Sequence, residues 1–197
     1  MFTGIITNVG KIKGIETKNN QSYFEIETDL AQSISLGDSI AVDGICLTAV
    51  SLGENSFRVQ AMPETLNLTN LSKKQIGSSL NLELALRLNQ GLDGHIVLGH
   101  VDGQGKVLRS ERQPDQNWVI EIEPPQSLMR YIAYKGSVCV NGVSLTISKD
   151  KTSSFEVSLI DYTLQNTNLC DIKISDFINL EIDVVARYIE KLGSVPK

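Results

Sequence analysis

Two pairs of side chains in the sequence could carry chemistry at a small-molecule site. Cys46 and Ser144 stand in matching contexts, since each follows a turn dipeptide and a branched hydrophobic residue and each precedes Leu-Thr. A thiol or hydroxyl at such a place can donate a hydrogen bond or, once activated, act as a nucleophile; its structural alternative is a small residue packed near a barrel mouth. The two histidines, His95 and His100, could carry a proton near neutral pH or serve as hydrogen-bonded structural residues.

Several familiar kinds of site are not indicated. The five-residue spacing of His95 and His100 does not place both on one helical face, and no cysteine is near enough in sequence to complete a zinc set, so no metal site is predicted. Ser144 lacks the Gly-x-Ser-x-Gly elbow of hydrolases, and neither a Gly-x-Gly-x-x-Gly nor a Walker loop occurs. Matched hydroxyl and amide side chains could instead be turn and capping residues or could bind a sugar-like polyol. These are Thr65 with Thr163 and Asn70 with Asn168.

The elements that position these residues occur twice, because the sequence is an internal duplication. Residues 39–48 align with 137–146, residues 56–59 with 154–157, residues 64–71 with 162–169 and residues 81–83 with 179–181, all at an offset of 98. At the front, residues 4–6 align with 99–101 at an offset of 95, which places His100 where the first copy has Ile5. Two copies fill the chain, with a boundary near residues 91–99.

Each copy has the pattern of a small β-barrel. Hydrophobic residues alternate with polar ones over 24–27, 80–86, 118–123 and 178–182, which is typical of half-buried strands with residues such as Asn81 and Glu83 on the other face. Asp43-Gly44 and Asn141-Gly142 favour tight hairpin turns. About six short strands per copy predict a closed barrel, so the fold class is mainly β, with two tandem six-stranded antiparallel barrels.

Helix is scarce in the pattern. Short helices are expected over 29–36 and 125–132, and an amphipathic helix over 184–192 carries an apolar stripe and ends at Gly193. This terminal helix has no counterpart in the first copy. Its stripe could dock on its own barrel or on another subunit.

Composition limits the classes of function. The 197 residues carry a net charge of −5, which disfavours binding to a nucleic-acid backbone. No apolar run is long enough to cross a membrane, and the N-terminus lacks the charged region of a secretory signal. Three cysteines without a Cys-x-x-Cys pair predict a reduced, cytoplasmic protein.

The chain resembles riboflavin synthase of the alpha-chain type, a family with a lumazine-binding repeat, from Met1 to about Asp183. The resemblance rests on the following motifs together with the duplication: Met1–Ile6, Gly44–Thr48, Met62–Thr65, Gly94–His95, Gly99–Gly103, Lys135–Ser137 and Asn141–Thr146. It implies two six-stranded barrels (residues 1–94 and 95–183), then a C-terminal helix and tail (184–197) expected to support a homotrimer. It also implies that two molecules of 6,7-dimethyl-8-ribityllumazine react by four-carbon transfer to riboflavin and 5-amino-6-(D-ribitylamino)uracil. No metal or redox cofactor is implied, and lumazine synthase is a further possible partner.

The resemblance also implies two substrate pockets, paired between the N-barrel of one subunit and the C-barrel of another. Catalytic roles are expected for Ser144 and His100 in proton removal or addition at one substrate, for Cys46 at the other, for Phe2 packed against a ring, and for Asp183. The first pocket is expected to use Gly4, Ile5, Ile6, Cys46, Leu47, Thr48, Gln60, Ala61, Met62, Pro63, Glu64 and Thr65. The second is expected to use Gly99, His100, Val101, Lys135, Ser144, Leu145, Thr146, Ser158, Leu159, Ile160, Asp161, Tyr162 and Thr163.

Two positions depart from the family pattern, and two other functions remain open. Asp161 stands where proline is expected, which could alter contacts to the ribityl chain, and Asp93 stands where a second glycine is usual. One alternative is a non-catalytic lumazine or flavin carrier of the same fold, whose relatives use one barrel for ligand. The presence of Leu-Thr after the turn in both copies favours the enzyme. The other alternative is an interaction scaffold without a ligand.

Overall fold

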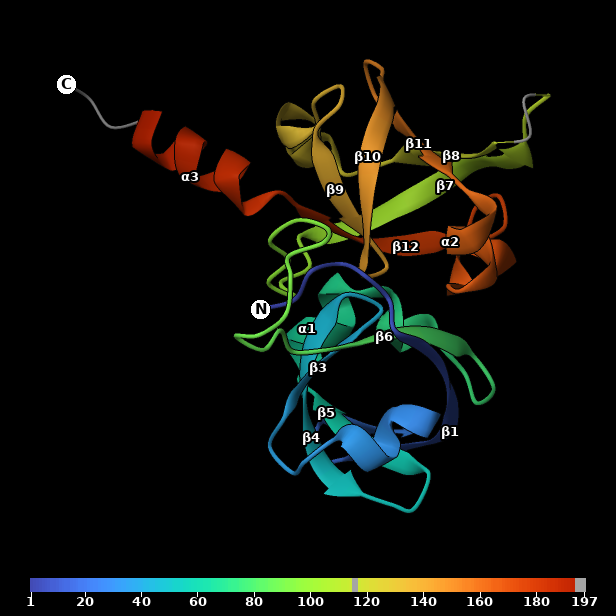
Figure 1. The fold of residues 1–197 in the computed structure, drawn as a ribbon, viewed down its shortest axis with the longest axis vertical. Coiled ribbons are helices and arrows are strands. Elements are labelled where there is room, and N and C mark those ends of the chain that lie inside the picture. Colours follow the sequence, from blue (N-terminus) through green and yellow to red (C-terminus); the bar gives the residue numbers. More distant parts are fainter. Residues whose placement is uncertain (115–116, 194–197) are drawn as a thin grey trace.

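The computed structural model describes residues 1–114 and 117–193 and contains two closed antiparallel barrels, one above the other in Figure 1. The first barrel has the strand order β1-β2-β5-β4-β3-β6. The second barrel has the equivalent order, β7-β8-β11-β10-β9-β12, in which β7 corresponds to β1 and β12 to β6. The first six strands are β1 (Asn8–Lys18), β2 (Gln21–Glu27), β3 (Ser39–Val42), β4 (Ile45–Leu52), β5 (Ser56–Ala61) and β6 (Ser79–Leu84). The second six are β7 (Gly103–Arg112), β8 (Trp118–Glu123), β9 (Ser137–Val140), β10 (Val143–Asp150), β11 (Phe155–Leu159) and β12 (Phe177–Ile182). The predicted fold class is confirmed.

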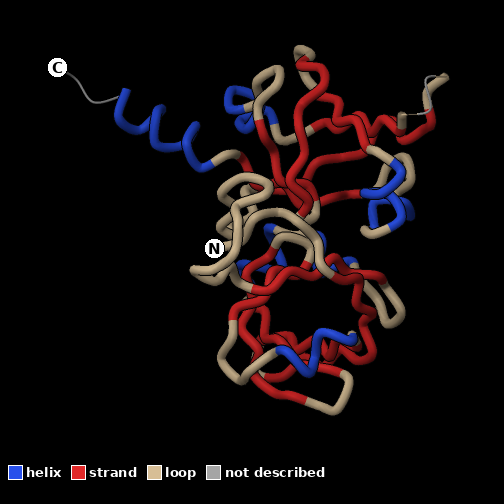
Figure 2. Tube along the Cα trace, viewed as in Figure 1, coloured by secondary structure: helices blue, strands red, loops and turns tan. Residues whose placement is uncertain are grey.

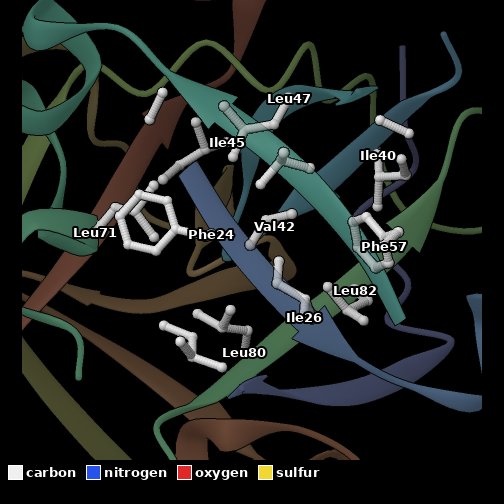
Figure 3. Close-up of a cluster of buried hydrophobic side chains, with 14 of the residues drawn as sticks. Phe24, Ile26, Ile40, Val42, Ile45, Leu47, Phe57, Leu71, Leu80 and Leu82 are labelled. Atoms are coloured by element: carbon white, nitrogen blue, oxygen red, sulfur yellow. The ribbon is translucent and has the colours of Figure 1, made fainter. Parts of the chain in front are cut away.

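The barrel interiors are filled by the alternating side chains that the sequence pattern singled out. Figure 3 shows the first barrel, where Phe24, Ile26 and Phe57 converge with neighbouring aliphatic residues on one interior. The second barrel repeats this with a separate cluster that includes Ile120, Ile122 and Phe155. Each barrel therefore has its own hydrophobic core, because the period of two places one face of every strand inside.

Both predicted hairpin turns are present. Asp43 and Gly44 join β3 to β4 with φ of +46° and +78°, and Asn141 and Gly142 join β9 to β10 with φ of +45° and +83°. Two consecutive residues in the left-handed region are what a tight two-residue hairpin requires, so the dipeptides were a reliable signal.

The helices agree with prediction in place but less well in type. The segments expected over 29–36 and 125–132 are short 3-10 helices at Asp29–Ser33 and Gln126–Tyr131. Four further short helices were not predicted: α1 (Pro63–Leu68), α2 (Asp161–Gln165), and 3-10 turns at Asn70–Lys73 and Asn168–Asp171. Thr69 and Thr167 cap the two 3-10 turns by accepting backbone N–H groups two residues on. The sequence had indicated the neighbouring Thr65, Thr163, Asn70 and Asn168 as capping candidates and not these two threonines.

The terminal helix α3 (Val184–Gly193) extends away from the second barrel, as Figures 1 and 2 show. It contacts the body through polar groups, since Arg187 lies 2.8 Å from Asp102 and Arg130 lies 2.7 Å from Glu190. None of its residues is buried, and Tyr188, Ile189 and Leu192 are 63%, 66% and 72% exposed. The apolar stripe therefore does not dock on its own barrel. The last four residues of the predicted tail lie outside the described residues.

The barrels meet across a pseudo-two-fold axis, so equivalent residues of the two copies face one another. Phe2 and Val97 exchange backbone hydrogen bonds of 2.6 and 3.1 Å. At the hairpins, a methyl group on Gly44 would lie 2.7 Å from the backbone nitrogen of Gly142, and the reverse distance is 2.8 Å. Only glycine permits this approach. The interface is self-complementary, like that of a symmetric dimer, because the two copies descend from one sequence.

Polar side chains complete this interface in reciprocal pairs. The backbone N–H of Asn70 donates to the side-chain oxygen of Asn179 at 2.7 Å, and that of Asn168 donates to Asn81 at the same distance. Asn81 is 0% exposed, although the alternation placed it on the polar face of a half-buried strand. That expectation was wrong for β6 because the second barrel covers its outer face.

One buried ion pair breaks the symmetry. Asp43 is fully buried and accepts hydrogen bonds from the Asn81 backbone and the Asn168 amide, both at 2.7 Å, while its other oxygen lies 2.7 Å from Lys74. In the second copy, Asn141 accepts the equivalent two hydrogen bonds, and Ile172 stands in the place of the lysine. The same interface therefore accommodates a charged pair on one side and a neutral pair on the other.

Candidate functional site

Two backbone segments, which we call straps, run along the junction between the barrels. The first strap is residues 2–7 and the second is residues 97–102, and the Phe2–Val97 bridge joins them near their beginnings. Each strap leads into its own barrel, the first into β1 and the second into β7, yet each passes over the other barrel on the way. The N-terminus lies at this junction in Figure 1.

The first strap lies on Ser144 in the second barrel. The Ser144 backbone N–H donates to the carbonyl of Gly4 at 2.7 Å, and a methyl group on Gly4 would lie 2.6 Å from Ser144 Cβ. Ile6 packs against the hydrophobic cluster of the second barrel. Gly4 has φ of +76°, so both its conformation and its contact require glycine.

The second strap repeats this arrangement on Cys46 in the first barrel. The Cys46 backbone N–H donates to the carbonyl of Gly99 at 2.9 Å, and a methyl group on Gly99 would lie 2.6 Å from Cys46 Cβ. Val101 belongs to the hydrophobic cluster of the first barrel. His100 is exposed on this strap.

This placement corrects the assignment of strap residues to pockets. Gly4, Ile5 and Ile6 were expected beside Cys46, and residues 99–101 beside Ser144, because each strap precedes its own barrel in the chain. The structure exchanges them. His100 accordingly lies on the strap over Cys46 and is not shown next to Ser144.

The histidine that reaches Ser144 is His95. Its Nδ1 lies 2.6 Å from Ser144 Oγ, its backbone N–H donates to the Thr3 carbonyl at 3.1 Å, and its side chain is buried. Burial lowers the pKa of His95 below its ordinary value of 6.5, and the nearby negative charge of Asp183 opposes that shift. In the neutral tautomer with its proton on Nε2, the imidazole accepts a hydrogen bond from the Ser144 hydroxyl at Nδ1; in the other neutral tautomer, Nδ1 donates to Ser144 Oγ.

Asp183 therefore joins Ser144 and His95 in one neighbourhood, while Phe2 has a different place. Phe2 was expected against a substrate ring, yet its side chain is 0% exposed and packs with Ala41, Val97 and Cys139 between the barrels. In this structure its ring lies among protein side chains.

Strand alternation decides which of the predicted residues face outward. In β4, Leu47 points into the core, whereas Cys46 is half-buried and Thr48 is exposed on the outer face. In β10, Leu145 points inward while Ser144 and Thr146 point outward in the same pattern. The candidate sites therefore lie on the outside of each barrel, below the strap that the other repeat supplies.

The two runs begin at the ends of β5 and β11, the strands that neighbour β4 and β10. Ala61 and Leu159 are buried, Gln60 is half-buried and Ser158 exposed. Beyond them, Met62, Ile160 and Tyr162 are exposed by 52%, 63% and 72%. The remaining residues of the two runs form the first turns of α1 and α2: Pro63, Glu64, Thr65, Asp161 and Thr163.

The two departures from the family pattern lie in different surroundings. Asp161 begins α2 at the position where Pro63 begins α1, and it pairs with Arg112 at 2.8 Å. An acidic residue suits the first turn of a helix, so aspartate replaces proline without loss of the turn. Asp93 lines a cavity of about 300 Å³ beside Thr3 and Ile5.

Lys135 occupies a strained position. Its φ is +66°, whereas the equivalent residue of the first repeat is Gly37, with φ of +89°. A lysine in the left-handed region is uncommon and is retained only where the surroundings hold it. Lys135 is exposed, with its ammonium group 5.2 Å from the ring of Tyr134.

Two buried carboxylates at the straps were missed by sequence reasoning. Glu83 accepts hydrogen bonds from Thr3 and Gly4, and Glu181 accepts them from Leu98, Gly99 and His100. Burial raises the pKa of both carboxyl groups above the ordinary value of 4.5, and the backbone hydrogen bonds oppose that shift. The sequence does contain one signal for them: Asn-Leu-Glu occurs at equivalent positions in both repeats, at 81–83 and 179–181. That match indicated the duplication but not a role for the glutamates.

A further cavity lies apart from the Cys46 and Ser144 sites. A cavity of about 480 Å³ lies between the barrels around Asn70 and Asn168 and is not lined by Cys46 or Ser144. Within residues 1–114 and 117–193, no group of His, Cys, Asp and Glu is placed to hold a metal ion. No helix in the same part of the chain is long and apolar enough to cross a membrane.

Comparison with known proteins agrees with this duplicated architecture. The family model for the lumazine binding domain matches residues 3–85 and again 98–183. Riboflavin synthase of Actinobacillus pleuropneumoniae is 42% identical over 192 residues, covering 97% of this chain and 89% of that protein. Riboflavin synthases of Brucella abortus (strain 2308) and Bacillus subtilis (strain 168) are 40% and 36% identical, covering 100% and 95% of this chain and 100% and 87% of theirs.

Solved structures share the fold at lower identity. LumP complexed with riboflavin matches with a TM-score of 0.86 at 23% identity, covering 92% of this chain and 99% of that one. LumP complexed with 6,7-dimethyl-8-(1'-D-ribityl) lumazine matches with a TM-score of 0.83 at 22% identity, covering 92% and 98%. With two matched repeats and several relatives aligned over nearly their whole length, the chain belongs to the riboflavin synthase family and contains its lumazine binding domain twice.

Proposed function

We propose that this protein catalyses the conversion of two molecules of 6,7-dimethyl-8-ribityllumazine into riboflavin and 5-amino-6-(D-ribitylamino)uracil. A four-carbon unit passes from one substrate molecule to the other. The two products together contain the atoms of two substrate molecules, so the reaction needs no external oxidant, reductant or further carbon source.

The observation that carries the proposal is the pair of similar but unequal sites. Cys46 below Gly99 and Ser144 below Gly4 have the same backbone surroundings and differ in the chemical group that they present. Donor and acceptor are the same compound, so two pockets of similar shape are needed. A difference between the pockets then determines which molecule gives the carbon unit and which receives it.

The Ser144 site is equipped for proton transfer. With His95 neutral and 2.6 Å from the hydroxyl, the pair can accept a proton from an acidic methyl group on the lumazine ring, and the Asp183 charge then stabilises the imidazolium. The Cys46 site is proposed to hold the other lumazine, with the thiol as a weak hydrogen-bond donor and His100 nearby on the strap. Thr48, Thr146, Lys135 and the runs 60–65 and 158–163 are proposed to contact the ring edges and the ribityl chains.

The proposed assembly is a homotrimer in which the first barrel of one subunit faces the second barrel of a neighbour. Two features support an interface of this kind. The apolar stripe of α3 is exposed along Tyr188, Ile189 and Leu192, and the candidate sites carry exposed apolar residues at Met62 and Ile160. Holding two heterocycles together in such an interface lowers the barrier by making a bimolecular encounter effectively intramolecular. A cytoplasmic location and an association with lumazine synthase complete the proposal.

The experiment is incubation of the purified protein with 6,7-dimethyl-8-ribityllumazine, with both compounds followed by absorbance and fluorescence. The expected result is riboflavin formed with two lumazines consumed per product, without added metal or cofactor. Lumazine or flavin binding without turnover would identify a carrier instead. No binding of either compound would leave only a scaffold role and would overturn the proposal.

A further inference from the structure

The buried carboxylates Glu83 and Glu181 share an arrangement that their positions in the chain do not suggest. Glu83 lies in β6 of the first barrel and is 4% exposed, and Glu181 lies in β12 of the second barrel and is 3% exposed. Both oxygens of each carboxylate accept hydrogen bonds from a strap. Glu83 binds the Thr3 N–H at 2.6 Å, the Thr3 hydroxyl at 2.7 Å and the Gly4 N–H at 2.9 Å.

Glu181 does the same for the second strap. Its oxygens accept the backbone N–H groups of Leu98, Gly99 and His100 at 2.7, 2.9 and 3.1 Å. Three consecutive N–H groups on one carboxylate fix the path of the backbone at this point. Hydrogen bonds to an ionised acceptor are stronger than neutral ones, so each carboxylate is well suited to hold its strap.

Each strap then acts on the opposite barrel. Gly4 donates its N–H to Glu83, and its carbonyl accepts the N–H of Ser144 in the second barrel. The carbonyl of Gly99, whose N–H is held by Glu181, accepts the N–H of Cys46 in the first barrel.

We propose that Glu83 and Glu181 are crossed positioning residues: Glu83 of the first barrel sets the geometry at Ser144, and Glu181 of the second barrel sets the geometry at Cys46. Each barrel thereby completes the site of the other, and neither site is correctly formed unless both repeats are docked. The inference rests on the proposed function only for what the two sites do; the positioning itself is a property of the fold.

Glutamine is the informative substitution because it keeps the size of the side chain and removes one of its two acceptors. In Glu83→Gln or Glu181→Gln, the new amide nitrogen would face a strap N–H group, donor against donor, so that one hydrogen bond is lost and replaced by a repulsive contact. The strap should open more often, and the residue beneath it should become more accessible.

Thiol labelling measures this opening without any turnover. In a Cys170→Ser background, Cys46 is half-buried below the second strap and Cys139 is 1% exposed in the interface. Glu181→Gln is expected to raise the rate of Cys46 alkylation about tenfold, the effect of losing one hydrogen bond to a charged group, whereas Glu83→Gln leaves it within about twofold. Because Cys139 is buried between the barrels, its labelling reports separation of the barrels or global unfolding, and it is expected to stay unlabelled in both variants.

The reciprocal measurement uses the other site. With Cys46→Ser and Ser144→Cys added to the same background, Glu83→Gln is expected to raise labelling at position 144 about tenfold and Glu181→Gln is not. Glu27→Gln is the matched control, because the Glu27 side chain is 56% exposed and lies away from the straps. It is expected to change neither rate.

The crossed pattern is the result that supports the proposal. Three results would overturn it: each glutamine variant exposing the thiol of its own barrel, both variants exposing both positions equally, or Cys139 becoming labelled as fast as the strap-covered thiol. If Glu181→Gln does not yield folded protein, Glu181→Asp, which keeps two acceptor oxygens on a shorter side chain, is expected to give the same crossed pattern at lower amplitude. Labelling is independent of catalysis, so this experiment and the riboflavin assay can fail separately.

Discussion

Replacement of Gly99 by alanine tests how closely the second strap approaches Cys46. Two physical effects add at this position. Gly99 has φ of +77°, and an alanine held in this left-handed region lowers the free energy of unfolding by about 1–2 kcal/mol. About 0.4–1 kcal/mol of this cost is offset because alanine reduces the conformational entropy of the unfolded chain. The new methyl group would also lie 2.6 Å from Cys46 Cβ and 2.8 Å from its backbone nitrogen. Such a contact forces strap or strand to shift, which costs about 1–3 kcal/mol more.

Gly37 separates the two effects. It has φ of +89°, and a methyl group there would meet nothing within 4 Å. Gly37→Ala therefore reports the backbone effect alone, about 1.5 kcal/mol or less, whereas Gly99→Ala is expected to cost about 1–3 kcal/mol more than Gly37→Ala. Gly77, also with φ of +89° and open space around it, provides a second control.

The assay is chemical denaturation of the three variants and the parent protein, checked by thermal unfolding. For a chain of this size, 1 kcal/mol corresponds to about 2–4 °C in Tm, so the controls should lower Tm by about 6 °C or less and Gly99→Ala should lower it by about 2–12 °C more than the controls do. Comparing midpoints requires that the m-values agree, since the two barrels could unfold in separate steps. If Gly99→Ala and Gly37→Ala lie within about 0.5 kcal/mol of one another, the strap does not press on Cys46 and the close approach described above is wrong.

Four further outcomes are expected. Ser144→Ala should reduce turnover about a hundredfold or more while lumazine affinity is largely kept, and unchanged turnover would remove Ser144 from the mechanism. Because burial lowers the pKa of His95, the imidazole stays neutral as the pH falls, and kcat/KM should decline only below pH 6.5, the ordinary pKa of histidine. A decline of kcat/KM that begins above pH 6.5 would contradict this. Lys74→Ile should cost about 3–5 kcal/mol by leaving Asp43 buried without its partner, and adding Asp43→Asn should recover most of that loss in denaturation, because the second repeat already has this neutral pair. Ile189→Asp should weaken the proposed homotrimer, as measured by light scattering, without lowering the stability of the subunit, since this side chain is 66% exposed. If the parent protein is a trimer and the variant is equally trimeric, α3 does not form the interface.

Much of the fold was predictable because it is determined locally and appears twice. Period-two hydrophobicity identified the strands that fill each barrel, and the Asp43-Gly44 and Asn141-Gly142 dipeptides identified the hairpins from the φ values that such turns need. Alignment of the repeats was enough to make Cys46 and Ser144 equivalent. The types of the short helices were less predictable, since turns of four to six residues depend on capping contacts such as those of Thr69 and Thr167.

Local patterns in the sequence were enough to predict a duplicated antiparallel barrel with matched thiol and hydroxyl positions. The folded structure was needed to find that each strap covers the opposite barrel, that His95 reaches Ser144, and that Glu83 and Glu181 bind the straps. The periodicity of hydrophobic residues indicates whether a side chain is buried, but it does not indicate which core the side chain belongs to or which residues it contacts. Contacts between segments about 50–100 residues apart, such as Cys46 with Gly99, depend on how the two barrels dock across their common axis, and no local pattern encodes that docking.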